Sequence, residues 1–281
     1  GYTSYVDLFD DYYDLEKNRG RMERYKPIAA HRQAFEKIAN ALNPLDRRCY
    51  FLSGSYGTGK SHLLLMLANY FANSSDLPEI EAFFKNYADA QNEVLLRPGE
   101  TLRETKAIAL KDKRKSGRFL VAFCRYNLNL DFEGAALRAL EAAMQKEGES
   151  ILLDTHYREA LRRIADWEER RNETRFYTDM EAVISRLYPD WTVNDVIDGL
   201  QKFNAHALKA FKQCFQVVTD SEFSYKKDNL HDIISDFLQN PKFKEIFKGI
   251  VFLYDEFGDA LDKNLVDYAT FLDFASFCAN S

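Results

Sequence analysis

The sequence predicts an α/β fold that combines a parallel sheet with a large helical insertion. An apolar run at residues 50–52 is followed by a glycine-rich stretch and then by a helical pattern at 63–71. A second apolar run, 248–257, is too short for a globular helix and contains two adjacent acids, which is typical of a buried parallel strand. Residues 134–247 show helical periodicity throughout, which predicts the insertion.

The composition is that of a folded chain. Of its 281 residues, 46% are hydrophobic and 14% aromatic, enough for the core of one large domain or two smaller ones. Its cysteines are far apart in apolar surroundings and form no metal-binding pattern, so we expect buried free thiols. The sequence shows no membrane span and no secretory signal, so we expect a cytoplasmic protein without membrane partners.

A helix is expected just before the first strand. Pro27 can start a helix, and residues 28–42 carry apolar side chains at helical spacing before the break at 43–44. His31 lies close to this apolar stripe and is interpreted as a packing residue. Residues 1–24 mix aromatic and acidic side chains before turning basic, and they are interpreted as a solvated lead-in segment.

The glycine-rich stretch matches the phosphate-loop pattern GxxxxGK[ST] between a predicted strand and a predicted helix. Backbone N–H groups can converge on phosphate only where Cβ atoms are missing, which Gly54, Gly57 and Gly59 provide. We expect Lys60 to reach the phosphates and act in catalysis, and Ser61 to ligate Mg²⁺ at the start of the helix. The competing interpretation is an ordinary glycine-rich turn. The candidate nucleotide contacts here are Gly54, Ser55, Tyr56, Gly57, Thr58, Gly59, Lys60, Ser61 and His62.

Two acids are expected at the carboxyl end of the last strand. Ligands in open α/β sheets bind at that end. We therefore expect Asp255 to hold Mg²⁺, directly or through water, and Glu256 to orient and deprotonate the attacking water. The alternative is a pair of ordinary strand-end acids.

Between these motifs, residues 77–110 are expected to be helical in pieces with a break at 97–99, and 119–124 to form a strand. The basic run 111–118 leads into that strand, at the edge opposite to the nucleotide, so it is interpreted as a solvated loop. DNA contact there is the alternative, although the net charge of −6 gives no overall attraction to nucleic acid. Residues 125–129 follow the strand on the nucleotide side.

The insertion is expected to contain several helices, and a capping-box pattern at Thr192–Asp195 marks the start of one of them. Glu159 and Arg163 suggest an exposed helix with ion pairs. The histidines of this region, His156, His206 and His231, lack the spacing of a metal or catalytic site and are assigned no chemistry. The expected helices are 135–146, 157–171, 180–187, 193–215 and 230–238.

These motifs together resemble a P-loop ATPase of the AAA+ group, whose members carry a catalytic Glu beside the Walker B Asp. The resemblance rests on the helix after Lys26, the loop 54–61 and the strand 250–256. The sequence of the loop and the sequence from Asp255 to Gly258 are similar to those of large ATP-binding proteins from bacterial phage-defence islands of the BREX type. Origin-recognition and STAND-like ATPases share the same motifs.

The resemblance implies ATP and Mg²⁺ as cofactors, ATP hydrolysis as the activity, and self-association or other defence-system subunits as partners. It also places Tyr25, Pro27 and Ile28 near the adenine, which an apolar surface would suit. The implied organisation is a lead-in at 1–24, the first part of the ATPase core at 25–133, the insertion at 134–247 and the Walker B part of the core at 248–281.

The end of the sequence departs from this pattern. Proteins of this group carry a sensor strand after Walker B, whereas residues 265–279 predict one amphipathic helix. We therefore expect these residues to be the amino-terminal part of a longer protein. Two functions are open: a motor or switch that hydrolyses ATP to remodel a DNA-bound defence or replication complex, and a nucleotide-binding scaffold with little turnover. Glu256 favours the first, and the lack of a sensor strand favours the second.

Overall fold

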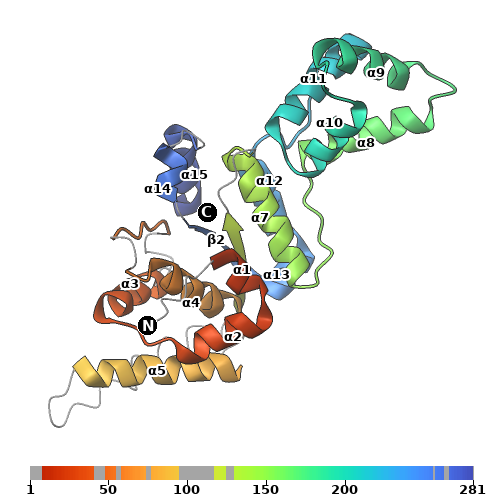
Figure 1. The fold of residues 1–281 in the computed structure, drawn as a ribbon. Helices are drawn as coiled ribbons and strands as arrows, with labels where there is room; N and C mark the ends of the chain where they lie inside the picture. Colours follow the sequence, from red (N-terminus) through yellow and green to blue (C-terminus); the bar gives the residue numbers. More distant parts are fainter. Residues whose placement is uncertain are drawn as a thin grey trace. The chain divides into compact units, whose positions relative to one another are not determined.

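In the computed structural model, the chain forms two compact units. Figure 1 labels the helices and strands of both. Unit 1 comprises residues 1–125, 244–255 and 272–281, and unit 2 comprises 126–243 and 256–271. The structure describes residues 8–40, 48–54, 58–73, 77–94, 117–124, 130–255, 257–262 and 266–280.

A parallel pair of strands lies in unit 1. These are β1 (Arg118–Cys124) and β2 (Phe247–Tyr254), with Val121 opposite Val251 and Phe123 opposite Leu253. The strands predicted from the apolar runs at 119–124 and 248–257 are thus confirmed, although β2 ends at Tyr254. β1 is buried from Leu120 to Cys124, whereas β2 is mostly half-buried.

The segment before the glycine-rich loop is not a strand. Residues 48–54 have no regular secondary structure, so the strand predicted at 50–52 was wrong. Its Phe51 side chain is 64% exposed, while Leu52 packs against the core. A strand needs a neighbour to satisfy its backbone N–H and C=O groups. In the described part of the chain, β1 and β2 pair with each other and not with this segment.

The core of unit 1 surrounds the helix α4 (Lys60–Ala72). Leu63 and residues 65–72 of this helix are all buried, because apolar side chains cover most of its circumference. It packs against β1, β2, α1 (Leu8–Tyr13) and α3 (Ala29–Asn40), as Figure 1 shows in part. This packing fixes the helix whose first turn follows the glycine-rich loop.

The two faces of the sheet pack against different partners. Phe123 and Leu253 belong to the cluster around α4. Phe252 alternates with Leu253 along β2, so it points to the other face. There its ring lies 5.3 Å from that of Phe274 in α15 (Tyr268–Asn280).

The first helices of the chain are part of the same core. Tyr12 in α1 and Met22 in α2 (Leu15–Arg24) are 1% and 4% exposed. α2 packs against α5 (Pro78–Val94). The interpretation of residues 1–24 as a solvated lead-in was therefore wrong for residues 8–24, because their apolar stripe is used for packing. Of the cysteines, two are buried and two half-buried, which corrects the expectation for Cys49 and Cys278.

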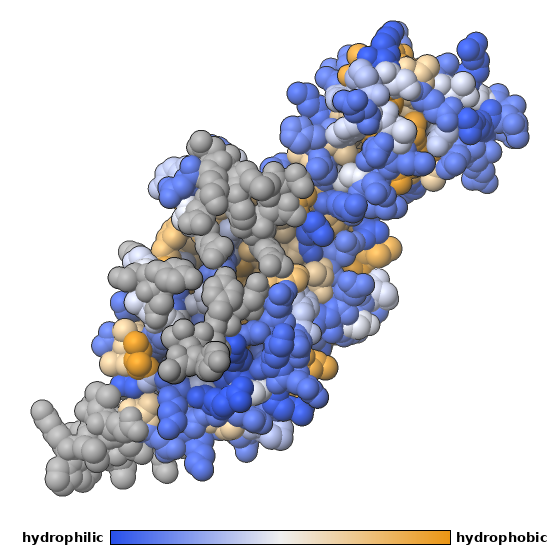
Figure 2. Space-filling model, viewed as in Figure 1, coloured by the Kyte–Doolittle hydropathy of each residue, from blue (hydrophilic) through white to orange (hydrophobic). Residues whose placement is uncertain are grey.

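Unit 2 is helical, and its visible face at α8–α11 is mostly hydrophilic, with apolar side chains between the helices (Figure 2). The helices predicted there are confirmed with one exception. The capping box of Thr192 and Asp195 is present, but the single helix expected at 193–215 is broken. Phe203 has a φ of 55°, and Asn204 caps the next helix by accepting bonds from its backbone N–H groups. The helices are α7 (Phe132–Lys146), α8 (His156–Glu169), α9 (Phe176–Leu187), α10 (Val193–Gln201), α11 (Ala205–Thr219), α12 (Leu230–Gln239) and α14 (Phe257–Asp262).

A further short helix, α13 (Pro241–Ile246), precedes β2 directly. It lies within the region 134–247 that was predicted to be helical, although it was not among the expected helices, and α14 was not predicted. Among the described helices, none combines the length and apolar character that crossing a membrane requires.

Candidate functional site

Ser61 and Asp255, the two predicted Mg²⁺ ligands, are in direct contact. Ser61 lies in the first turn of α4, Asp255 directly follows β2, and the Ser61 Oγ donates a 2.9 Å hydrogen bond to the Asp255 carboxylate. Hydroxyl and carboxylate oxygens are ligands of the kind Mg²⁺ takes in proteins. In the described residues no group of three or more His, Cys, Asp or Glu side chains gathers as a metal site. A hydroxyl and one carboxylate fit a cation that keeps water and substrate oxygens as its other ligands, as Mg²⁺ usually does.

The Lys60 side chain folds back over its own loop. Its Nζ donates a 2.8 Å hydrogen bond to the backbone carbonyl of Gly54. A Cβ atom at Gly54 would lie 3.2 Å from the Thr58 Oγ1 and 3.8 Å from the Lys60 Cδ. The lack of a side chain at Gly54 thus lets the two ends of the loop approach. The Gly54 carbonyl that accepts this bond is neutral. An anion would bind the Lys60 ammonium group more strongly and could take the place of the carbonyl.

Gly59 forms the turn from the loop into α4. Its φ is 82°, in the left-handed region that favours glycine, and it occupies the N-cap position without a side-chain cap. The first N–H groups of a helix have no intrahelical acceptor, and the helix dipole adds positive potential there. Backbone geometry at the start of α4 therefore suits an anion.

His31 contacts this loop, which the sequence did not indicate. Its Nε2 lies 2.9 Å from the carbonyl oxygen of Thr58, and its Nδ1 lies 2.9 Å from the hydroxyl of Tyr25. The interpretation of His31 as a packing residue was therefore incomplete. Its helix was predictable, but the bond to Thr58 depends on how α3 packs beside the loop.

The residues expected near the adenine differ in exposure. Tyr25 is 7% exposed, its ring stacks on Phe83 with centroids 6.0 Å apart, and burial raises the pKa of its hydroxyl. Pro27 is also buried, and its carbonyl accepts a 2.8 Å bond from Arg32. Ile28 is 56% exposed, so its apolar side chain is accessible to a ligand.

His62 lies beside Tyr25 rather than in solvent. The two ring centroids are 5.9 Å apart, and burial, followed by the charge of Arg21, lowers the His62 pKa. The imidazole is therefore mostly neutral at neutral pH and adds little charge for binding phosphate. Several candidate residues lie outside the described part of the chain: Ser55, Tyr56, Gly57, Arg125 and Glu256. The nucleotide contacts predicted for residues 55–57 and the catalytic role predicted for Glu256 stay predictions.

Unit 2 contains buried polar contacts of its own. His156 is 2% exposed, pairs with Glu133 at 3.1 Å and contacts the backbone carbonyl of Lys227. Glu159, expected on an exposed helix, is 5% exposed and is paired with Arg162 and Arg163. These partners explain the polar groups structurally, and no chemistry is assigned to them.

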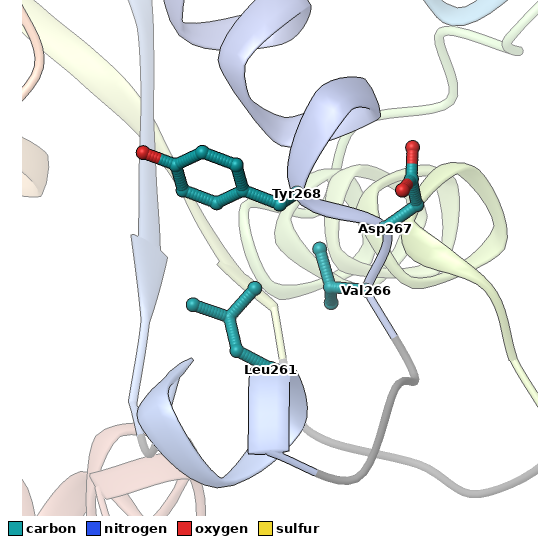
Figure 3. Close-up of a pocket in the computed structure, with 4 residues that line it drawn as sticks. All are labelled: Leu261, Val266, Asp267 and Tyr268. Carbon is teal, nitrogen blue, oxygen red and sulfur yellow. The ribbon is translucent and has the colours of Figure 1, made fainter.

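A cavity of about 400 Å³ also lies in unit 2, between the end of α14 and the start of α15 (Figure 3). In Figure 3 the apolar side chains of Leu261 and Val266 point toward each other, while the carboxylate of Asp267 points away from them. That carboxylate already accepts two bonds from Thr270. The cavity therefore offers little polar chemistry. Its lining residues are Leu261, Val266, Asp267 and Tyr268.

Comparison of the chain with protein-family models, curated proteins and solved structures returned no match.

Proposed function

We propose that this chain is an AAA+-like ATPase module that binds ATP with Mg²⁺ at the loop 54–61 and hydrolyses it. The observation that carries the proposal is the hydrogen bond between Ser61 and Asp255. These two residues come from separate motifs, and a phosphate-binding site needs both at one place. An ordinary glycine-rich turn would have no reason to meet an acid at the end of a distant strand.

ATP and Mg²⁺ would be bound by groups at the start of α4 and at the end of β2. The backbone N–H groups of the first turn of α4 would take the phosphate oxygens, and Lys60 would leave the Gly54 carbonyl to pair with them. Ser61 and Asp255 would hold Mg²⁺, which supplies positive charge beside the phosphates when bound.

Hydrolysis is proposed in preference to a scaffold without turnover because of Glu256. This residue follows Asp255 directly, and a binding site alone needs no second acid to accept a proton from water. The parallel pairing of β1 and β2, with Asp255 just after β2, supports a P-loop core with a helical insertion.

The test of the proposal is ATP binding by the Lys60→Ala variant. Calorimetry should show affinity reduced about 10- to 100-fold, since a hydrogen bond to a charged group contributes about 1.5–3 kcal/mol. Lys37→Ala removes an exposed lysine from the last turn of α3 and should bind ATP like the wild type. Equal affinity of Lys60→Ala and the wild type would remove the proposal.

The cellular role is proposed from the resemblance alone. It comprises a cytoplasmic location, a phage-defence complex, self-association and DNA as a possible partner of that complex. Of the basic run 111–118 only Gly117 and Arg118 are described, and the Arg118 guanidinium lies 4.9 Å from the centre of the Phe247 ring. ATP turnover of the full-length protein with and without DNA tests this part.

A further inference from the structure

His31 connects two segments that are remote in sequence. It lies in the first turn of α3, while Tyr25 ends α2 and Thr58 lies in the glycine-rich loop. Both of its ring nitrogens have a partner at 2.9 Å. A histidine that merely fills space needs neither contact, so the pair of bonds calls for a physical explanation.

The two bonds together define one form of the neutral imidazole. The Thr58 carbonyl can only accept a hydrogen bond, so Nε2 must carry the proton and donate it. Nδ1 then has a lone pair and accepts from the Tyr25 hydroxyl. Tyr25 is 7% exposed and its ring packs on Phe83, so its hydroxyl is held in place. The other neutral tautomer could still donate from Nδ1 to the Tyr25 hydroxyl oxygen, but it would lose the bond to the Thr58 carbonyl.

The same imidazole also packs against Gly59. A Cβ atom at Gly59 would lie 2.8 Å from the His31 Cε1, closer than such contacts occur. Gly59 has a φ of 82° and leads into α4. His31 thus contacts the residue at which the chain turns into α4 and bonds to the carbonyl just before it.

We propose that His31 is a positioning residue of the phosphate loop. It anchors the Thr58 carbonyl and fills the space beside Gly59, so that the first turn of α4 stays directed at a bound anion, and the bond from Tyr25 holds the other side of the ring in place. The inference rests on the proposed function, in which the anion is the polyphosphate of ATP.

The tautomer is tested without nucleotide. In protein carrying ¹⁵N-labelled histidine, imidazole NMR should show His31 as the single Nε2–H form, with the signal assigned by its loss in His31→Gln. In Tyr25→Phe, which removes only the hydroxyl, the Nε2–H form should persist because the Thr58 carbonyl still needs a donor, while the Nδ1 resonance should shift because it loses its partner. A mixture in the wild type would overturn the inference, and an unchanged Nδ1 resonance in Tyr25→Phe would overturn the role of Tyr25.

ATP binding is then measured by calorimetry. His31→Phe keeps a ring but loses the donor, and it should bind ATP about 3- to 10-fold more weakly, the effect of one lost hydrogen bond. His31→Gln keeps an N–H donor for Thr58 and should stay within about 2-fold of the wild type. The matched control, Gln33→Ala, alters an exposed residue of α3 and should change neither ATP affinity nor the unfolding midpoint.

The outcomes separate this inference from the proposed function. Weaker binding by His31→Phe with rescue by His31→Gln supports it, as does weaker binding by Tyr25→Phe if His31→Phe proves unstable. Wild-type affinity in His31→Phe overturns the inference, while the proposed function stands as long as Lys60→Ala still loses ATP. If the wild type itself does not bind ATP, the proposed function fails and the inference fails with it.

Discussion

Ser61 and Asp255 lie 194 residues apart in the sequence, yet the hydroxyl of one donates a 2.9 Å hydrogen bond to the carboxylate of the other. This bond links the first turn of α4 to the end of β2. The two elements also pack against each other. The position of the carboxylate thus follows from the packing of α4 and β2 in unit 1.

The first prediction concerns this pair. Asp255→Ala and Ser61→Ala should each lower the affinity for ATP in the presence of Mg²⁺ much more than in EDTA, because they remove oxygen ligands of the cation. Calorimetry in the two buffers gives the comparison. Since the side chains are in contact, the losses in the double variant should be smaller than the sum of the single ones. Equal effects with and without Mg²⁺ would contradict the assignment.

The second prediction concerns Glu256. Glu256→Gln keeps the size and hydrogen bonding of the side chain but cannot accept a proton, so it should bind ATP normally and hydrolyse it much more slowly. Phosphate release by full-length protein is the measurement, with ATP affinity as its control. Equal turnover of wild type and Glu256→Gln would show that this residue is an ordinary strand-end acid.

The third prediction concerns pH. Burial, then Arg21, lowers the pKa of His62 in the folded protein, with His31 acting in the same direction and Asp11 against it. As pH falls below about 6.5, the unfolded chain therefore takes up a proton before the folded one does. Stability should decrease as the pH falls from 6.5 toward the folded pKa, and urea unfolding at a series of pH values measures this.

His62→Gln should make the unfolding free energy less dependent on pH in that range. His206→Gln changes an exposed histidine and should leave the dependence as it is. A His62→Gln protein with the same pH profile as the wild type would show that other groups cause it.

The fourth prediction concerns a buried amide pair. Asn69 is 1% exposed and exchanges hydrogen bonds of 2.8 and 2.9 Å with Asn18, which is 5% exposed. Asn69→Ala leaves the Asn18 amide buried without this partner, so the free energy of unfolding should fall by about 1–3 kcal/mol. Urea unfolding measures it. Asn86→Ala loses a single bond near the surface and should cost less, about 1 kcal/mol.

The fifth prediction concerns the contact between α10 and α11. Replacing a helical Gly with Ala ordinarily stabilises by about 0.5–1 kcal/mol. At Gly199, however, the new Cβ would lie 2.4 Å from the Cβ of Ala207, which is fully buried. Overpacking should dominate, and Gly199→Ala should lower the free energy of unfolding by about 1–3 kcal/mol.

Two further variants test this explanation. Ala207→Gly in the Gly199→Ala background removes the clashing methyl group and should recover part of the loss. Gly258→Ala meets no neighbour within 4 Å and should not destabilise the protein. Loss of stability in Gly258→Ala as large as in Gly199→Ala would point to a backbone effect instead of packing.

The sequence by itself determined the local elements. β1 and the start of β2 follow from short continuous apolar runs. Most helices of unit 2 follow from the period of their apolar residues, because side-chain direction repeats with backbone geometry. The helix after Lys60, the capping box at Thr192 and the candidate phosphate loop are likewise patterns of neighbouring residues.

Only the tertiary structure decided which of these elements meet. Periodicity could not show that residues 50–52 do not pair with β1 or β2, or that α1 and α2 pack into the core. The bonds from Ser61 to Asp255 and from His31 to Thr58 join residues that are distant in sequence. Such contacts depend on how whole helices and strands pack, since a hydrogen bond forms only when both partners are brought within about 3 Å in the right direction.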